Sequence, residues 1–141
     1  VTAVLAEPQR VALVVDDEPQ LRSSLERALR RVGYEVLSAA GSDSAYAILS
    51  QTKVDVLLLD LRMPQVSGET LFLAVIRRWP SLIGRVILMS GDPYAMQVDW
   101  PPELQACPLL VKPFGLDELY SVIGKVLPAE GFPLRRHPGQ R

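Results

Sequence analysis

The chain has 141 residues, a formal net charge of −1 and a single cysteine. This length suits one globular domain, and 48% hydrophobic with 22% charged residues argues against disorder, collagen-like repeats and coiled coil. The basic excess typical of nucleic-acid binding is missing, so we expect no direct nucleic-acid contact. Cys107 alone can form neither an internal disulfide nor a thiolate zinc site. No signal peptide or membrane-spanning run is visible, and we expect a cytoplasmic location with no membrane contact in this segment.

The chain opens with a strand pattern followed by a helix pattern. Residues 11–15 form a β-branched apolar run, which is typical of a buried strand. The run stops at Asp16-Asp17, and apolar residues then recur at helical spacing between Pro19 and Gly33. The predicted helix therefore begins at the proline and ends at the glycine.

The same alternation continues through the next unit. Residues 34–39 are strand-like, and Ser42 or Asp43 is placed to cap a short helix. Residues 54–59 then form the most convincing strand pattern of the chain and end in Asp60. A carboxylate again follows a predicted strand.

The last units complete five repeats of strand and helix. A helix pattern over residues 71–79 is followed by a strand at 85–89, a weak stretch at 93–108, a strand at 109–111 and a helix at 116–126. The Pro101-Pro102 pair inside the weak stretch predicts a short or broken fourth helix. The fold class is therefore α/β, a doubly wound, five-stranded parallel sheet with five helices.

Five polar residues follow predicted strands: Asp16, Asp17, Asp60, Ser90 and Lys112. In a parallel sheet these strand ends meet at one edge, where ligands bind. Carboxylates brought together repel one another unless a cation neutralises them, and oxygen ligands suit Mg²⁺. The alternative for Asp16-Asp17 is simple capping of the first helix.

This grouping also suits phosphoryl chemistry. Asp60 beside a divalent cation can act as a nucleophile toward phosphorus, Lys112 can balance the phosphoryl charge, and Ser90 can donate a hydrogen bond. The alternatives are a solvated surface lysine and a serine that only forms a turn.

The motifs that carry these residues resemble the receiver domain of two-component response regulators. They are Asp16-Asp17, Asp60-Leu61-Arg62-Met63-Pro64 with Gly68, Ser90-Gly91 and Lys112-Pro113-Phe114. The resemblance spans residues 10–127 and implies a CheY-like, flavodoxin-like fold. Residues 1–9 would then be an N-terminal linker, and the proline-rich and arginine-rich residues 128–141 a flexible tail.

The resemblance also implies a role for each site residue. Asp60 would accept a phosphoryl group from the phosphohistidine of a sensor histidine kinase or phosphotransfer domain, in trans or within the same parent chain. Mg²⁺ would be held by Asp17, Asp60 and the backbone carbonyl of Arg62, and by Asp16 through water. Ser90 and Lys112 would bind the phosphoryl oxygens, and the Lys112–Pro113 peptide bond would be cis. Such a domain catalyses its own phosphorylation and dephosphorylation without being a conventional enzyme.

Three features differ from the general pattern or refine it. Leu109 stands where the family usually has a tyrosine or phenylalanine that follows the movement of the Ser90 hydroxyl. Arg62 and Asp92 flank the phosphorylation pocket, and we expect them to pair across its mouth and to tune phosphoryl lifetime; the alternative is two solvated charges. Residues 85–92 and 106–114 are similar to the C-terminal receivers of hybrid sensor histidine kinases; the alternative is a free-standing regulator that works by binding partners.

Two other functions fit the same fold. A magnesium-dependent aspartyl phosphatase of the haloacid dehalogenase type would need a second carboxylate two residues after the nucleophile, where this chain has Arg62, and a cap segment. An interaction module that is never phosphorylated would not need the acidic residues. The one histidine, His137, lies in the predicted tail, which disfavours a phosphohistidine carrier.

Overall fold

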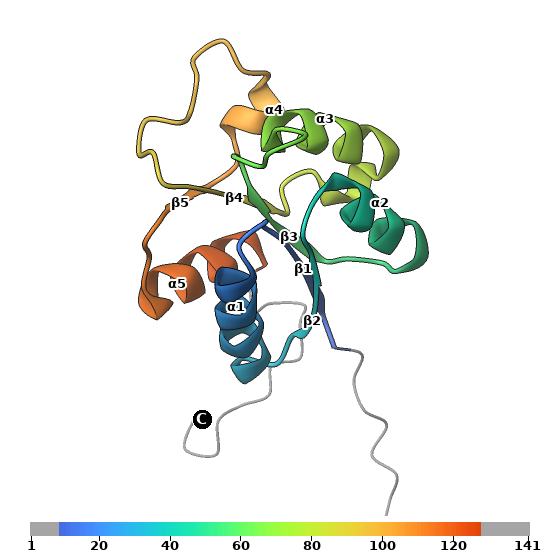
Figure 1. Cartoon of the computed structure of the whole chain (residues 1–141), viewed down its shortest axis with the longest axis vertical. Coiled ribbons are helices and arrows are strands. Elements are labelled where there is room, and N and C mark those ends of the chain that lie inside the picture. Colours follow the sequence, from blue (N-terminus) through green and yellow to red (C-terminus); the bar gives the residue numbers. More distant parts are fainter. Residues whose placement is uncertain (1–8, 128–141) are drawn as a thin grey trace, which may run out of the picture.

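The computed structural model describes residues 9–127, which form a parallel sheet with helices on both faces (Figure 1). The strands are β1 (Val11–Val15), β2 (Glu35–Ala39), β3 (Val56–Asp60), β4 (Val86–Ser90) and β5 (Leu109–Val111). They are all parallel and lie in the order β2-β1-β3-β4-β5. This order confirms the predicted doubly wound fold.

Helices cover the sheet from both sides, and alternate residues of each strand supply the two cores. The helices are α1 (Pro19–Arg31), α2 (Ser42–Gln51), α3 (Gly68–Arg78), α4 (Pro102–Gln105) and α5 (Leu116–Val126), with a short 3₁₀ turn η1 (Pro80–Leu82). Leu13 and Leu57 pack toward α2, α3 and α4, whereas Val14 and Leu58 pack toward α1 and α5. Because β1, β3 and β4 are buried on both faces, they have continuous apolar sequences.

Several local boundaries differ from the sequence prediction by one to three residues; α3, for example, begins at Gly68 rather than at residue 71. The third strand begins at Val56 rather than at residue 54, because Asp55 is used to fix the start of β1: its Oδ2 accepts the Val11 N–H at 2.8 Å. The N-cap of α2 is Gly41, not Ser42 or Asp43, and no side chain caps this helix. The prediction that one of those two residues caps α2 is therefore wrong.

The predicted weak fourth helix is confirmed as a single four-residue turn. Pro101 is its N-cap and Pro102 its first residue, so the proline pair starts the helix rather than interrupting it. Leu104 on this turn is buried in the core. Cys107 is also buried, its Sγ donates to the Glu103 carbonyl at 3.4 Å, and burial raises its pKa to about 12. This thiol is a packing residue.

Some predictions concern parts of the chain outside the described residues. The linker predicted at residues 1–9, apart from Gln9, and the tail predicted at 128–141 with His137 lie there. Within residues 9–127, no helix is both long enough and apolar enough to cross a bilayer.

Candidate functional site

Three carboxylates lie together at the carboxyl edge of the sheet. Asp16 and Asp17 follow β1, Asp60 ends β3, and these two strands are direct neighbours. One carboxylate oxygen from each residue lies within 4.8 Å of the others. Asp16 and Asp60 are buried, whereas Asp17 is exposed. The sheet topology therefore brings together the three aspartates that the sequence singled out.

The carboxylates of Asp16 and Asp17 do not cap α1. The N-cap is Glu18, and no side chain accepts a hydrogen bond there. Asp16 Oδ1 instead accepts the Glu18 N–H at 2.9 Å, while the Arg22 guanidinium donates to the Asp16 backbone carbonyl at 2.7 Å. These contacts hold the loop after β1 and leave Asp16 Oδ2 facing the cluster.

Lys112 extends from the end of β5 into the acidic cluster. Its Nζ lies 2.8 Å from Asp16 Oδ2, 3.4 Å from Glu18 Oε1 and 3.5 Å from Asp60 Oδ2. Burial lowers the pKa of Lys112, but the hydrogen bond to Asp16 and the charge of Asp60 outweigh it, so the pKa is raised. Lys112 is thus a half-buried ammonium and not a solvated surface lysine.

Glu18 was not identified from the sequence. Its carboxylate contacts the Lys112 ammonium, which also contacts Asp16 and Asp60, although the Glu18 side chain is 63% exposed. The signal that could have identified Glu18 as a site residue is its position directly after Asp16-Asp17.

Asp60 is ionised less readily than an ordinary aspartate. Burial is the main cause that raises its pKa to about 6, and the Asp16 charge raises it further. The hydrogen bond from the Arg62 N–H and the contacts with Lys112 lower the pKa, but by less. The contacts with Lys112 and the Arg62 N–H therefore do not offset the cost of burying the charged carboxylate. The donor set fits Mg²⁺, since it consists of hard carboxylate oxygens from three converging side chains.

Ser90 ends β4 beside Lys112, whose backbone N–H donates to the Ser90 carbonyl at 2.7 Å. The Ser90 side chain is buried, and its Oγ accepts the Asp92 N–H at 3.0 Å. Asp92 Oδ1 in turn accepts the Tyr94 N–H at 2.9 Å. Ser90 thus shapes a turn, and a hydroxyl that accepts one bond still has its O–H to donate.

Two charged side chains flank this group. Arg62 Nη2 lies 3.8 Å from Asp92 Oδ2, with side-chain exposures of 77% and 41%. The expected pair forms, in a geometry worth less than ~1 kcal/mol. The Lys112–Pro113 peptide bond is cis.

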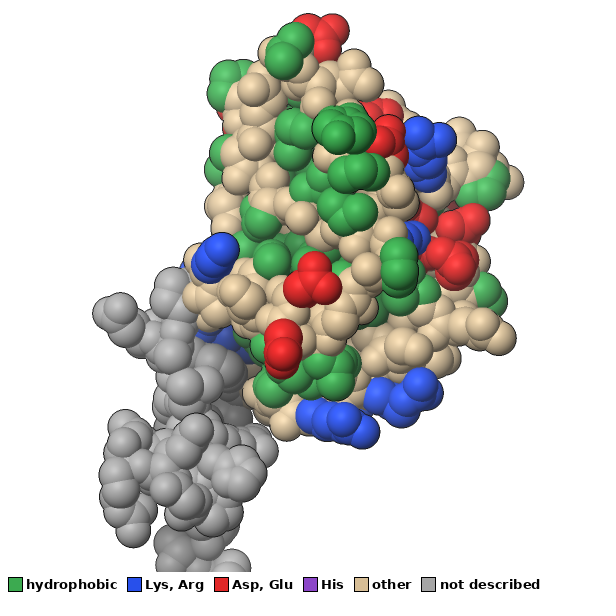
Figure 2. All heavy atoms as spheres, turned by 90° about the vertical axis from the view of Figure 1, so that its left-hand side faces the viewer, with side chains coloured by type: hydrophobic (Ala, Val, Ile, Leu, Met, Phe, Trp, Pro, Cys, Tyr) green, Lys and Arg blue, Asp and Glu red, His purple; other side chains and the backbone are tan. Residues whose placement is uncertain are grey.

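The side of the domain formed by the β4–α4 loop, β5 and α5 is rich in hydrophobic side chains (Figure 2). Leu109 on β5 is half-buried, and the loop carries Tyr94 and Val98, which are 86% and 95% exposed. The short α4 leaves this side less covered than a full helix would.

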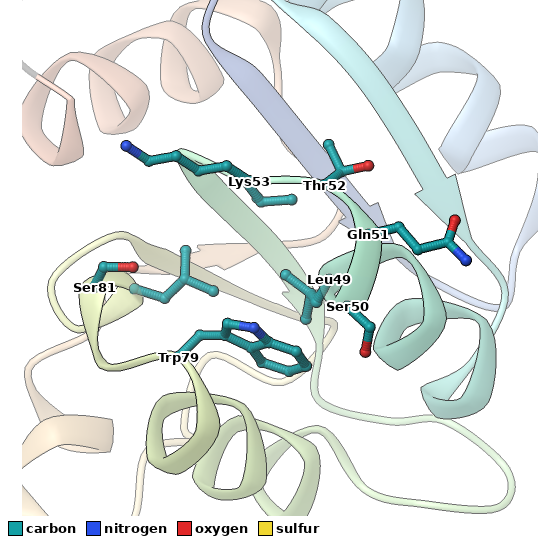
Figure 3. Close-up of a pocket in the computed structure, with 9 residues that line it drawn as sticks. Leu49, Ser50, Gln51, Thr52, Lys53, Trp79 and Ser81 are labelled. Carbon is teal, nitrogen blue, oxygen red and sulfur yellow. The ribbon is translucent and has the colours of Figure 1, made fainter.

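Two hollows of about 280 Å³ lie at different places. One opens beside Asp17, between the start of α2 and the loop containing Met63 and Val66. The other lies between Leu49, Lys53 and Trp79 (Figure 3). It borders the segment before β3, at the opposite edge of the sheet from Asp60. Only the first hollow adjoins the acidic cluster.

A doubly wound α/β domain of this strand order, with an acidic cluster and a lysine at its carboxyl edge, defines the class of CheY-like domains. The model of the response regulator receiver domain family matches residues 12–124, and the chain belongs to this family.

Relatives come from regulators and from a phosphotransferase. The chain is 33% identical over 120 residues to the transcriptional regulator NtrC of a Bradyrhizobium strain, covering 85% of this chain and 25% of that protein. It is 29% identical over 118 residues to sporulation initiation phosphotransferase F of Bacillus subtilis, covering 82% and 92%. The chain spans about a quarter of the length of the first curated relatives that it matches. These relatives support the receiver family and do not single out hybrid kinases.

Solved structures of the same fold include one that contains Mg²⁺-BeF. The response regulator TrrA of Thermotoga maritima, in complex with Mg²⁺-BeF, has a TM-score of 0.74 and 28% identity and covers 84% of this chain and 100% of that one. TrrA has also been solved in complex with the histidine kinase ThkA, with a TM-score of 0.72 and coverage of 84% and 99%.

Proposed function

We propose that this chain is the phosphoacceptor receiver domain of a two-component phosphorelay. Asp60 takes a phosphoryl group from the phosphohistidine of a sensor histidine kinase or phosphotransfer domain, and the modification shifts a two-state equilibrium that changes partner binding. The observation that carries the proposal is a buried Asp60 within reach of Asp16, Asp17 and the Lys112 ammonium. TrrA, solved with Mg²⁺-BeF and with a histidine kinase, supports it.

The proposed step is an in-line displacement. A bond forms between an Asp60 carboxylate oxygen and phosphorus while the phosphorus–nitrogen bond of the phosphohistidine breaks, and its electron pair stays on the imidazole. Lys112 and Ser90 bind oxygens of the transferred group. Asp17, Asp60 and the Arg62 carbonyl would hold Mg²⁺, with Asp16 acting through water, and the bound ion would neutralise charge on the transferred group.

The partner and the setting follow from this chemistry. Sensor kinases form their phosphohistidine in the cytoplasm, where we expect this domain to act. Origin from a hybrid sensor kinase stays a prediction based on the sequence resemblance.

Intact mass after incubation with acetyl phosphate and Mg²⁺ tests the proposal. We expect the native chain to gain one phosphoryl group, Asp60→Asn to gain none, and chelation of Mg²⁺ to abolish the gain. Asp43→Asn, which removes a carboxylate in the first turn of α2, is the matched control and should be phosphorylated normally. A native chain that gains no mass, and whose melting temperature Mg²⁺ does not raise, would instead be an interaction module.

A further inference from the structure

The first residue of α3 lies against the main chain at the end of β3. Gly68 N–H donates to the Leu61 carbonyl at 3.0 Å and closes the loop of residues 61–68. A Cβ on Gly68 would lie 2.6 Å from the Leu61 Cα and closer still to the Asp60 carbonyl oxygen. No ordinary Cβ approaches main-chain atoms this closely, so only glycine fits at this junction.

Neither side of this junction can move easily. The Asp60 end of β3 is paired with β4, and the Leu61 N–H donates to the Met89 carbonyl at 2.9 Å. On the other side, α3 is fixed by Leu71 and Phe72, which are buried in the core. A side chain at Gly68 would therefore distort the loop between the two anchored elements.

That loop carries Arg62, whose N–H donates to Asp60 Oδ1 at 3.1 Å. We propose that Gly68 is a positioning residue for the phosphoacceptor site. By allowing α3 to lie against the end of β3, it fixes the loop that holds the Asp60 carboxylate and presents the Arg62 carbonyl to Mg²⁺. This inference rests on the proposed function, because the cation is its readout.

Gly68→Ala tests the inference by Mg²⁺ titration calorimetry on the full chain. We expect Mg²⁺ to bind at least about tenfold more weakly, the usual effect of disturbing groups that orient metal ligands. Phosphorylation by acetyl phosphate should slow at low Mg²⁺ and recover as Mg²⁺ is raised. A merely structural role would lower thermal stability without this recovery.

Gly84→Ala is the matched control. Gly84 has φ +83° and open space around its Cβ position, and it precedes β4 at the opposite edge of the sheet. This substitution is strained and should lower the melting temperature while Mg²⁺ affinity stays native. Equal Mg²⁺ affinity in Gly68→Ala and Gly84→Ala would overturn the inference.

A milder variant covers the case in which Gly68→Ala does not fold. Ser67 is the N-cap of α3, and its Oγ accepts the Thr70 N–H at 3.3 Å. Ser67→Ala loosens the same junction without adding an atom, and we expect Mg²⁺ binding weakened a few-fold; native affinity would contradict the inference. A native chain that neither binds Mg²⁺ nor gains phosphoryl overturns the proposed function itself, which distinguishes the two failures.

Discussion

At the residue scale, the properties of Asp60 are set by opposing neighbours. Burial and the Asp16 carboxylate disfavour its charge, while Lys112 and the Arg62 N–H favour it. Burial dominates, so the folded domain holds a proton on Asp60 at a pH where the unfolded chain would have released it. The buried Asp60 carboxylate is therefore a source of instability in the metal-free protein at neutral pH.

This imbalance predicts a pH dependence of stability. Because the Asp60 pKa is raised to about 6 in the folded state, its contribution to stability should fall as pH rises from about 4 to about 6 and stay low above that. Asp60→Asn lacks this loss and should be more stable than the native chain at pH 7, by roughly 1–3 kcal/mol. Urea denaturation of both proteins in a chelator checks this, and a stability difference that does not change with pH would contradict it.

The exposed pair at the mouth of the pocket gives a second prediction at this scale. Arg62 and Asp92 lie 3.8 Å apart, and we expect the pair to restrict access of the water that attacks phosphorylated Asp60. Arg62→Gln and Asp92→Asn should each speed dephosphorylation, by up to about fivefold given the modest strength of exposed pairs. Phosphoryl loss followed by mass spectrometry measures this.

The control for that prediction is a comparable exposed pair far from the site. Arg30 and Glu26 on α1 lie 3.9 Å apart, and Arg30→Gln should leave dephosphorylation unchanged. The double variant of Arg62 and Asp92 should be no faster than either single one, because both remove the same contact. Unchanged dephosphorylation rates in Arg62→Gln and Asp92→Asn would show that the two residues are solvated charges with no effect on phosphoryl lifetime.

At the scale of elements, the sequence predicts the strands that are buried on both faces. It does not predict boundaries and caps that depend on individual hydrogen bonds. The continuous apolar runs identify β1, β3 and β4 because these strands are buried on both faces. The start of β3 was misplaced because Asp55 is recruited by a backbone N–H of β1, 44 residues away. The cap of α2 was misassigned because an extended glycine fills that position without a side chain.

The same distinction holds for the site. Asp16, Asp17, Asp60 and Lys112 were predictable because each lies at or just after the carboxyl end of a strand, and a parallel sheet brings such positions to one edge. The contact of Glu18 with Lys112 depends on a rotamer and on a residue 94 positions away. The close approach of Gly68 depends on how α3 packs against β3, which the motif alone does not show.

At the scale of the whole molecule, strand order places the site. The sheet runs outward from β1 in both directions, and β1 and β3 meet where the order changes direction. Ligands bind at such switch points in doubly wound sheets. The aspartates lie at this point, and Lys112 and Ser90 reach it from the ends of β5 and β4, so one edge of the sheet gathers groups from four strands.

Locating the phosphoryl group on the chain decides whether Asp60 is the phosphoacceptor. The native chain would be treated with acetyl phosphate and Mg²⁺, reduced with borohydride, which converts an aspartyl phosphate to homoserine and releases phosphate, and then digested for peptide mass mapping. We expect homoserine at position 60 alone, and none when Mg²⁺ is chelated. An unmodified Asp60, or homoserine at another aspartate, would contradict this expectation.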